Sequence, residues 1–273
     1  MKRLIDLLQY CSYPGIAQNP AGPFILEPGV IALDSVGGDY HGSGDMNVFV
    51  DTAAGRNGTG YIIFTSGYKP PVLYTPKSTS TATISACTSH VPIIPYMNVV
   101  ATVSCRRQAD GHIRIQQLAA DGRSAVPGKV SEPFPPHPCE APLMFRRGDV
   151  YYALFGHNCP CCSEGSELFV FTAPHPLGPW TGGTDVNVDS SGKRVVKGQS
   201  AFVVAIGDEE PTQPKSRQLG GSQSEADVYM WATDEWGSGQ TRAGNFQYWA
   251  PLSFAKNGSV EQLEYQQSWT LEL

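Results

Sequence analysis

The sequence predicts an all-β protein organised as a β-propeller, in which four-stranded sheets, the blades, surround a central axis. Three observations favour this fold. The 273 residues include 29 glycines and 22 prolines but only 16% charged residues, as expected for many short strands joined by tight turns. Strand-like apolar runs recur in pairs, and residues 139–181 combine them in one unit. No segment has a helical pattern long enough to organise the fold.

Residues 139–181 contain the clearest strand pattern. The run LMFRRGDVYYALF has a polar turn at residues 146–149 between two apolar stretches, which predicts a β-hairpin. The run ELFVFTA predicts the next strand of the same sheet. A rigid, proline-containing turn at residues 176–180 then closes the unit and delivers one aromatic side chain.

Other segments continue this rhythm. Residues 44–66 contain NVFVD and YIIFT, whose alternation predicts two strands around a glycine-containing turn. Residues 67–111 are rich in proline, serine and threonine and predict an inserted loop. A strand is expected at residues 199–206, a polar loop at residues 207–226 and a further strand at residues 228–233. With 41% apolar residues, the whole chain is expected to form a single domain over residues 1–273.

The order of features in residues 139–181 resembles glycoside hydrolase family 43, a group of five-bladed β-propellers. Three motifs carry the likeness: Glu-Ala-Pro at residues 140–142, the Phe–basic–Gly–Tyr-Tyr series of the hairpin, and Leu-Gly-Pro-Trp at residues 177–180. The likeness is greatest to the exo-β-1,3-galactanase branch. It covers most of residues 4–66 and 112–271.

The resemblance extends the expected order of elements. It implies that residues 4–26 are the tail of a blade, that residues 112–126 hold the last strand of the next blade, and that residues 245–254 form another strand. Residues 258–271 are expected to supply closing strands. The family has a further blade before these elements, so the first blade is expected to be largely missing and the activity reduced. The family is extracellular, although residues 1–8 do not form a signal peptide.

The resemblance also implies the site of an inverting glycosidase. In such a site one group protonates the leaving oxygen, while another removes a proton from water on the opposite face of the sugar. Glu140 is the expected acid. Gln199 is the amide expected to position the water, or to relay its proton through an imidic-acid tautomer. Asp45 is a third polar group that would bind sugar hydroxyls or tune the acid. Asp234 and Trp236 are expected to line the sugar site.

The residues alone leave other interpretations open. Glu140 has no adjacent cation, so partial burial would raise its pKa, but it also fits a surface glutamate at a strand end. Gln199 fits a strand residue bonded to backbone, and Asp45 fits the cap of a turn. Trp236 fits an ordinary core aromatic. Pro142 is expected to bias the preceding residue towards an extended backbone.

A second group of reactive residues comprises His157, Cys159, Cys161 and Cys162. One histidine and three cysteines could bind zinc, but their spacing differs from that of common zinc fingers. A disulfide and free thiols are the alternatives, and no metal is assigned. The chain has seven cysteines, an odd number, so the cysteine pattern leaves the cellular compartment open.

Composition excludes several classes of partner. The net charge is −6 and there is no basic stripe, which argues against a nucleic-acid partner. No apolar run approaches the ~20 residues of a membrane-spanning helix. No cofactor is expected, and the oligomeric state is not predicted.

These features predict a glycoside hydrolase that removes a terminal β-linked sugar from a galactan-like oligo- or polysaccharide with inversion. The alternative is a catalytically inactive carbohydrate-binding propeller, which the unusual residues 159–162 favour because the family has a substrate wall there. A small zinc-stabilised module is a third hypothesis, based on residues 157–162 alone.

Overall fold

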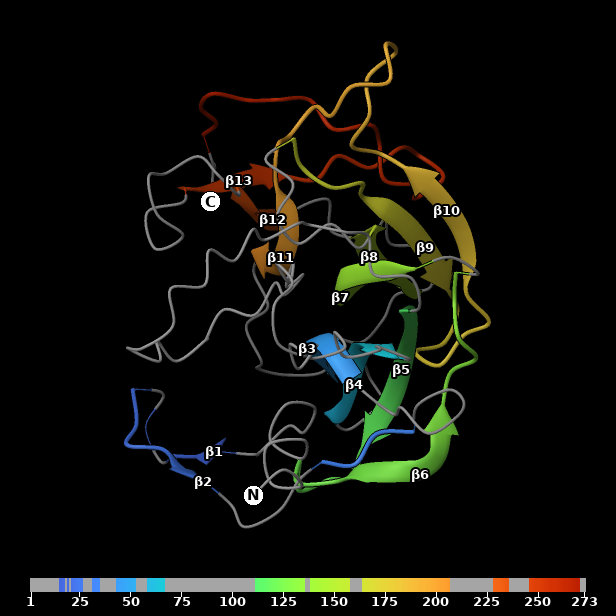
Figure 1. The fold of residues 1–273 in the computed structure, drawn as a ribbon, viewed down its shortest axis with the longest axis vertical. Helices are drawn as coiled ribbons and strands as arrows, with labels where there is room; N and C mark the ends of the chain where they lie inside the picture. The colour runs from blue at the N-terminus through green and yellow to red at the C-terminus, as the bar shows by residue number, and fades with distance from the viewer. Residues whose placement is uncertain are drawn as a thin grey trace, which may run out of the picture.

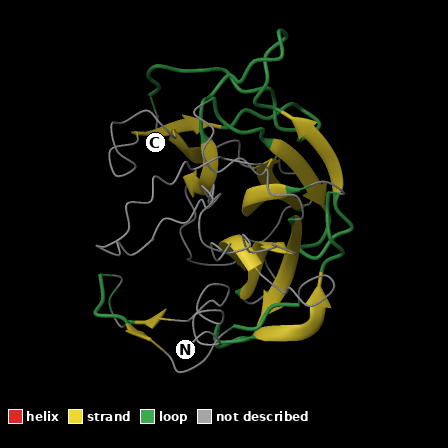
Figure 2. Ribbon diagram, in the orientation of Figure 1, coloured by secondary structure: helices red, strands yellow, loops and turns green. Residues whose placement is uncertain are grey.

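In a computed structural model of the chain, the described residues are all-β: they form strands, turns and loops, with no helix among them (Figure 2). The described residues are 15–17, 19, 21–26, 31–34, 43–52, 58–66, 111–135, 138–157, 164–206, 228–235 and 246–270. None of them forms a helix long and apolar enough to cross a membrane. The all-β prediction is therefore confirmed.

Three larger sheets contain most of the strands, and neighbours within each are antiparallel. The first sheet has the order β3 (Ser43–Asp51), β4 (Thr59–Ser66), β5 (His112–Leu118) and β6 (Ala125–Val130). The second has the order β7 (Cys139–Arg147), β8 (Val150–His157), β9 (Phe169–Ala173) and β10 (Thr181–Asp185). The third comprises β11 (Gln199–Ile206), β12 (Val228–Glu235) and β13 (Phe246–Pro251). Two short strands, β1 (Gly15–Ile16) and β2 (Ile25–Leu26), pair separately.

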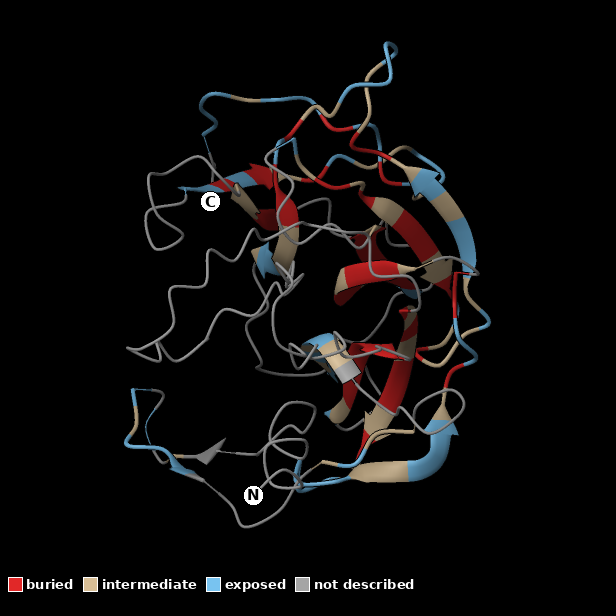
Figure 3. Cartoon of the chain, in the orientation of Figure 1, coloured by how far each residue is buried: buried red, intermediate tan, exposed pale blue. Residues whose placement is uncertain are grey.

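The three larger sheets lie around a shared centre, with their first strands, β3, β7 and β11, nearest to it (Figure 1). Strand β7 contacts both β3 and β11. The last strands, β6 and β10, lie on the outside, and exposed residues gather on them whereas buried residues follow the middle strands (Figure 3). The first residues of three sheets can therefore meet in one place.

The second sheet is buried on both faces, which explains its apolar sequence. Successive side chains of a strand point to opposite faces. In β8, Tyr151 and Phe155 join the core shared with the first sheet, while Tyr152 and Leu154 join the core shared with the third. A strand buried on both faces lacks polar alternation, and the run YYALF has none.

The hairpin predicted for residues 143–155 is confirmed, and β7 and β8 extend it to residues 139–157. Arg147 pairs with Val150, and the turn between them contains Gly148 with φ of +59°. The predicted turn at residues 176–180 also delivers its aromatic side chain inwards, because Trp180 stacks on Phe134 with ring centroids 5.2 Å apart.

Two predicted elements differ from the structure. Residues 112–126, expected to hold one last strand, contain β5 and the start of β6, because a turn intervenes in which Gly122 N–H donates to Ala119 C=O. Residues 258–270, expected to close the fold as strands, form only an isolated bridge between Phe254 and Val260 among the described residues. Residues 67–110 of the expected insertion, between the paired strands β4 and β5, lie outside the described residues.

Candidate active site

Glu140, the second residue of β7, lies at a β-bulge of the strand. The pairing of β7 with β8 shifts between Glu140 and Leu143, and Ala141 has a left-handed backbone with φ of +53°. The expectation that Pro142 would keep Ala141 extended is therefore wrong. The bulge overrides the local preference, because the extra residue must leave the ladder and the bend re-aims its neighbours. The Ala141 N–H donates to Asp45 Oδ2 at 3.2 Å, which links β7 to β3.

The environment of Glu140 favours a neutral carboxyl group. The residue is only 6% exposed, and its pKa is raised from 4.5 to about 8. Burial is the main cause of this rise and the nearby charge of Asp45 adds to it, while a hydrogen bond from the Gln199 side chain acts in the opposite direction. The buried Oε2 atom of Glu140 has no hydrogen-bond partner among the described residues. A proton on this group is therefore available to a bound molecule near neutral pH.

Asp45 faces the same region from β3. Although the residue is exposed to solvent on one side, the surrounding protein raises the pKa of its carboxyl group by desolvation. The hydrogen bond from Ala141 N–H acts in the opposite direction. Two carboxyl groups close together cannot both ionise freely, so Asp45 and Glu140 share one electrostatic environment.

Gln199 and Asp234 lie side by side on the third sheet. They are direct partners in the β11–β12 ladder, so their side chains share a face, and Gln247 of β13 extends the row. Gln247 Nε2 donates to Asp234 Oδ1 at 3.2 Å. Gln199 is 8% exposed, and its backbone C=O accepts a hydrogen bond of 2.7 Å from Thr233 Oγ1.

A pocket of about 250 Å³ joins these groups. It lies where β3, β7 and β11 begin, and its lining includes Asp45, Gln199 and Asp234 together with Ala141, the neighbour of Glu140. The structure thus brings four of the five predicted site residues together. The fifth, Trp236, lies outside the described residues.

Close packing behind the pocket fixes the backbone at both Glu140 and Gln199. Gly156 is the ladder partner of Glu140, and a Cβ atom there would lie 1.9 Å from Ser166 Oγ. Gly198 precedes Gln199, and a Cβ atom there would lie 2.1 Å from Thr233 Oγ1. Neither position has room for a side chain, because a Cβ atom would overlap the hydroxyl group of a neighbouring residue.

A charged cluster lies beside the start of β7. His157, the ladder partner of Cys139, has its Nδ1 3.0 Å from Glu167 Oε2. Arg194 bridges Glu167 and Asp185. Burial tends to raise the pKa of Glu167, but its hydrogen bond with His157 and the charge of Arg194 outweigh burial and lower it.

The predicted reactive group at residues 157–162 is only partly described. His157 is engaged with Glu167, whereas Cys159, Cys161 and Cys162 lie outside the described residues. Among the residues that the structure describes, no cluster of three histidine, cysteine or acidic side chains is arranged to hold a metal ion.

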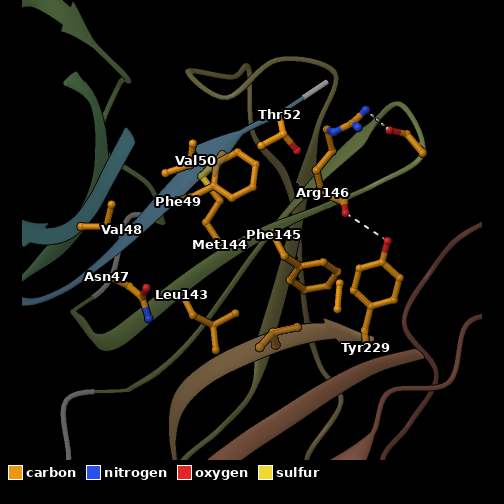
Figure 4. A pocket seen from close by; sticks show the side chains of 13 residues that line it. Asn47, Val48, Phe49, Val50, Thr52, Leu143, Met144, Phe145, Arg146 and Tyr229 are labelled. Atoms are coloured by element: carbon orange, nitrogen blue, oxygen red, sulfur yellow. Dashed lines mark hydrogen bonds between the residues drawn. The ribbon is translucent and has the colours of Figure 1, made fainter. Parts of the chain in front are cut away.

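A larger pocket, of about 340 Å³, lies further along the same inner strands. Apolar side chains such as Phe49 and Phe145 line it, and the Tyr229 hydroxyl donates to Arg146 C=O at 3.1 Å (Figure 4). Arg146 also forms an ion pair with the buried Asp51, with Nε 3.6 Å from Oδ1. Among the described residues no carboxylate lines this pocket, whereas Asp45 and Asp234 line the smaller one.

Sequence reasoning missed two groups that contact the aspartates of the smaller pocket. One is the Ala141 N–H, which reaches Asp45 only because the backbone is left-handed. The other is Gln247, whose place beside Asp234 depends on the register between β12 and β13. Neither has a signal in the sequence, because a bulge and a register are set by tertiary packing.

Comparisons with known proteins identify the fold. No protein-family model matches the chain, and no curated protein matches it by sequence. A GH43 β-1,3-galactosidase solved with galactodeoxynojirimycin superposes with a TM-score of 0.61 at 15% identity, covering 96% of this chain and 68% of that one. The exo-β-1,3-galactanase of Clostridium thermocellum gives a TM-score of 0.57 at 15% identity, covering 93% of this chain and 42% of that one.

The exo-β-1,3-galactanase of Phanerochaete chrysosporium, solved with galactose, also gives a TM-score of 0.57 at 15% identity. Here too 93% of this chain is covered, but the chain spans only 42% of that structure. The resemblance indicated by residues 139–181 is thus confirmed for the fold: in structure the chain resembles the β-1,3-galactanases of glycoside hydrolase family 43.

Proposed function

We propose that the chain is a glycoside hydrolase that releases a terminal β-linked galactose from a galactan-like oligo- or polysaccharide with inversion. The observation that carries the proposal is Glu140, a buried carboxyl group with a pKa raised to about 8 beside an open, polar pocket. A group of this kind is suited to general acid catalysis near neutral pH.

In this proposal Glu140 donates its proton to the leaving glycosidic oxygen as the bond to the anomeric carbon breaks. Gln199, on another sheet, holds the water that attacks the opposite face of that carbon. Asp45 binds sugar hydroxyls and, by its charge, helps to keep Glu140 protonated. Asp234 contacts the sugar from the third sheet.

The same proposal includes the architecture. The three larger sheets would be successive blades of one propeller, formed by a single domain, with β3, β7 and β11 as the innermost strands. Their arrangement around a shared centre and the likeness to GH43 structures support this interpretation. A galactose ligand is favoured because neighbours of the same fold were solved with galactose and with galactodeoxynojirimycin.

The test is release of galactose from β-1,3-galactan and from β-1,3-galactotriose, with the anomer of the first product identified by NMR. We expect α-galactose, as inversion requires, and loss of release in Glu140→Gln. Glu264→Gln is the matched control, because it makes the same chemical change at an exposed glutamate. Binding of the oligosaccharide without release would instead support the inactive carbohydrate-binding alternative.

A further inference from the structure

A tight turn after the third sheet displays an asparagine that the proposed hydrolysis does not use. Phe254 and Val260 form an isolated antiparallel bridge, and the residues between them make the turn. Within it, Gly258 N–H donates to Ala255 C=O at 2.8 Å, and Ala255 N–H donates to Ser259 C=O at 2.9 Å. Gly258 has φ of +85°, a conformation that glycine adopts without strain. The turn therefore has a defined shape.

The base of this turn is fixed to the core, whereas its tip faces solvent. Val260 is buried, and the Phe254 ring lies edge-on to the Tyr152 ring with centroids 5.7 Å apart. The Tyr152 hydroxyl also donates to Gly258 C=O at 2.6 Å. Three polar residues at the tip are exposed: Lys256, Asn257 and Ser259. A group attached to the tip would therefore project away from the core.

The exposed tip carries the acceptor sequence for N-linked glycosylation, because residues 257–259 are Asn-Gly-Ser. The sequence requires an asparagine, a hydroxyl residue two positions later and no proline between them. Asn257 Oδ1 accepts hydrogen bonds from Ser259 N–H at 3.0 Å and from Ser259 Oγ at 2.7 Å. Bonds to this oxygen draw electron density towards it, so the Nδ2 protons of the same amide are easier to remove. Neither bond uses Nδ2, the atom that a glycan would join.

The turn lies at the opposite end of β7 from Glu140. The guanidinium of Arg147, the last residue of β7, lies over the Phe254 ring at 4.5 Å from its centroid. Glu140 is the second residue of the same strand. At a rise of about 3.3 Å per residue, Arg147 and Glu140 are roughly 20 Å apart along the strand. A bulky group on Asn257 would therefore leave the smaller pocket open.

We propose that Asn257 is an acceptor for N-linked glycosylation in the folded chain, a property that does not depend on the proposed hydrolase function. The co-substrate is an oligosaccharide joined through its anomeric carbon to a lipid diphosphate. Asn257 Nδ2 forms a bond to that carbon as the carbon–oxygen bond to the diphosphate breaks. Nδ2 gives up one proton to a base of the transferase, and the lipid diphosphate leaves.

The test incubates the purified, folded chain with a single-subunit oligosaccharyltransferase and a lipid-linked oligosaccharide. Asn57→Gln serves as the background, because residues 57–59 form a second acceptor sequence. A standard acceptor peptide shows that the transferase is active. We expect the chain to gain the mass of one oligosaccharide. Removal of the glycan by peptide N-glycosidase in heavy-oxygen water should then leave a labelled aspartate at position 257.

Two substitutions and one internal control test the acceptor sequence. Ser259→Ala removes the hydroxyl and should abolish the mass gain, whereas Ser259→Thr retains a hydroxyl and should remain modified. Asn19 is the matched control, because it is exposed and its Oδ1 also accepts a backbone N–H two residues later, from Ala21. Pro20 follows Asn19 and excludes it as an acceptor, so it should stay unmodified.

The outcomes are distinct from those for the proposed function, which galactose release tests separately. A folded chain that gains no mass while the standard peptide is modified would overturn the proposal. Modification that persists in Ser259→Ala, or that occurs at Asn19, would also overturn it. An aspartate at position 257 without the heavy-oxygen label would show spontaneous deamidation in place of glycosylation, with the same consequence.

Discussion

The same three inner strands line two pockets of opposite character. Where β3, β7 and β11 begin, the pocket gathers Asp45, Gln199 and Asp234, with Glu140 adjacent to it. Further along, the larger pocket is lined by apolar side chains together with Asn47, Thr52, Arg146 and Tyr229, and by no carboxylate among the described residues. The pocket that gathers the predicted site residues is thus the smaller of the two.

The difference lies in how the polar groups are satisfied. Near the larger pocket, the buried Asp51 accepts a hydrogen bond of 2.6 Å from Tyr151 and interacts with Arg146. Such pairing stabilises a fold, because buried polar groups are costly when they lack partners. At the smaller pocket, the Oε2 atom of Glu140 is buried without a partner among the described residues. Buried groups with a shifted pKa and an incomplete set of hydrogen bonds are common at functional sites.

The largest expected effect separates the two pockets by activity. Glu140→Gln should reduce galactose release by about 10²–10⁴-fold, because an amide cannot donate the proton that a carboxylic acid donates. Tyr229→Phe, which removes a hydroxyl at the larger pocket, should leave kcat/KM close to that of the wild type. Steady-state kinetics on β-1,3-galactotriose measures both. Comparable losses in the two variants would break the distinction.

The next effect concerns the pH dependence of stability. Because the pKa of Glu140 rises from 4.5 to about 8 on folding, the folded chain retains a proton that the unfolded chain has lost between these values. The free energy of unfolding should therefore fall as pH rises through this window, by at most ~1.4 kcal/mol per pH unit from this group. Urea unfolding of the wild type and of Glu140→Gln isolates the contribution. If the free energies of unfolding of the wild type and of Glu140→Gln changed in parallel between pH 4.5 and pH 8, the raised pKa of Glu140 would be contradicted.

At the larger pocket the expected effect is on stability alone. Tyr151→Phe removes a hydrogen bond to the fully buried Asp51 carboxylate and should lower the free energy of unfolding by about 1.5–3 kcal/mol. Activity per folded molecule should persist, because Tyr151 does not line the smaller pocket. Urea unfolding and active-site-normalised kinetics test both parts. A lost kcat with normal stability would assign Tyr151 to the chemistry instead.

The smallest effect tests the strained bulge that aims Glu140. A left-handed backbone costs a non-glycine residue about 1–2 kcal/mol, whereas glycine adopts it freely at an entropic cost of about 0.5–1 kcal/mol. Ala141→Gly should therefore raise the free energy of unfolding by up to about 1 kcal/mol. Ala125→Gly, in β6, should lower it by ~0.5–1 kcal/mol. Equal destabilisation of both variants would show that Ala141 is unstrained.

The sequence predicted what local pattern can encode. Alternation, apolar runs and turn residues located the hairpin of residues 143–155 and the paired strands of residues 44–66. It failed at Ala141, where a proline after it indicated an extended backbone but a bulge imposed a left-handed one. The preference of a residue before proline for an extended backbone is outweighed there by the hydrogen bond from Ala141 N–H to Asp45 and by the packing of β7 against β3.

The candidate site was predictable in membership but not in geometry. Glu140, Gln199 and Asp45 each begin a strand, and their convergence follows if those strands are innermost. The row formed by Gln199, Asp234 and Gln247 depends on register, and a shift of one residue would move each side chain to the other face. Hydrophobic pattern alone does not fix that register when, as in β12, residues 229–233 are all buried.

The central claim is that Glu140 is a protonated acid at neutral pH. The most direct measurement is infrared titration of its carboxyl band, obtained as the difference between wild type and Glu140→Gln. We predict that the protonated band persists at neutral pH and disappears near pH 8, as burial and the charge of Asp45 require. Loss of the band near the ordinary glutamate value of 4.5 would contradict the assignment of Glu140 as the acid.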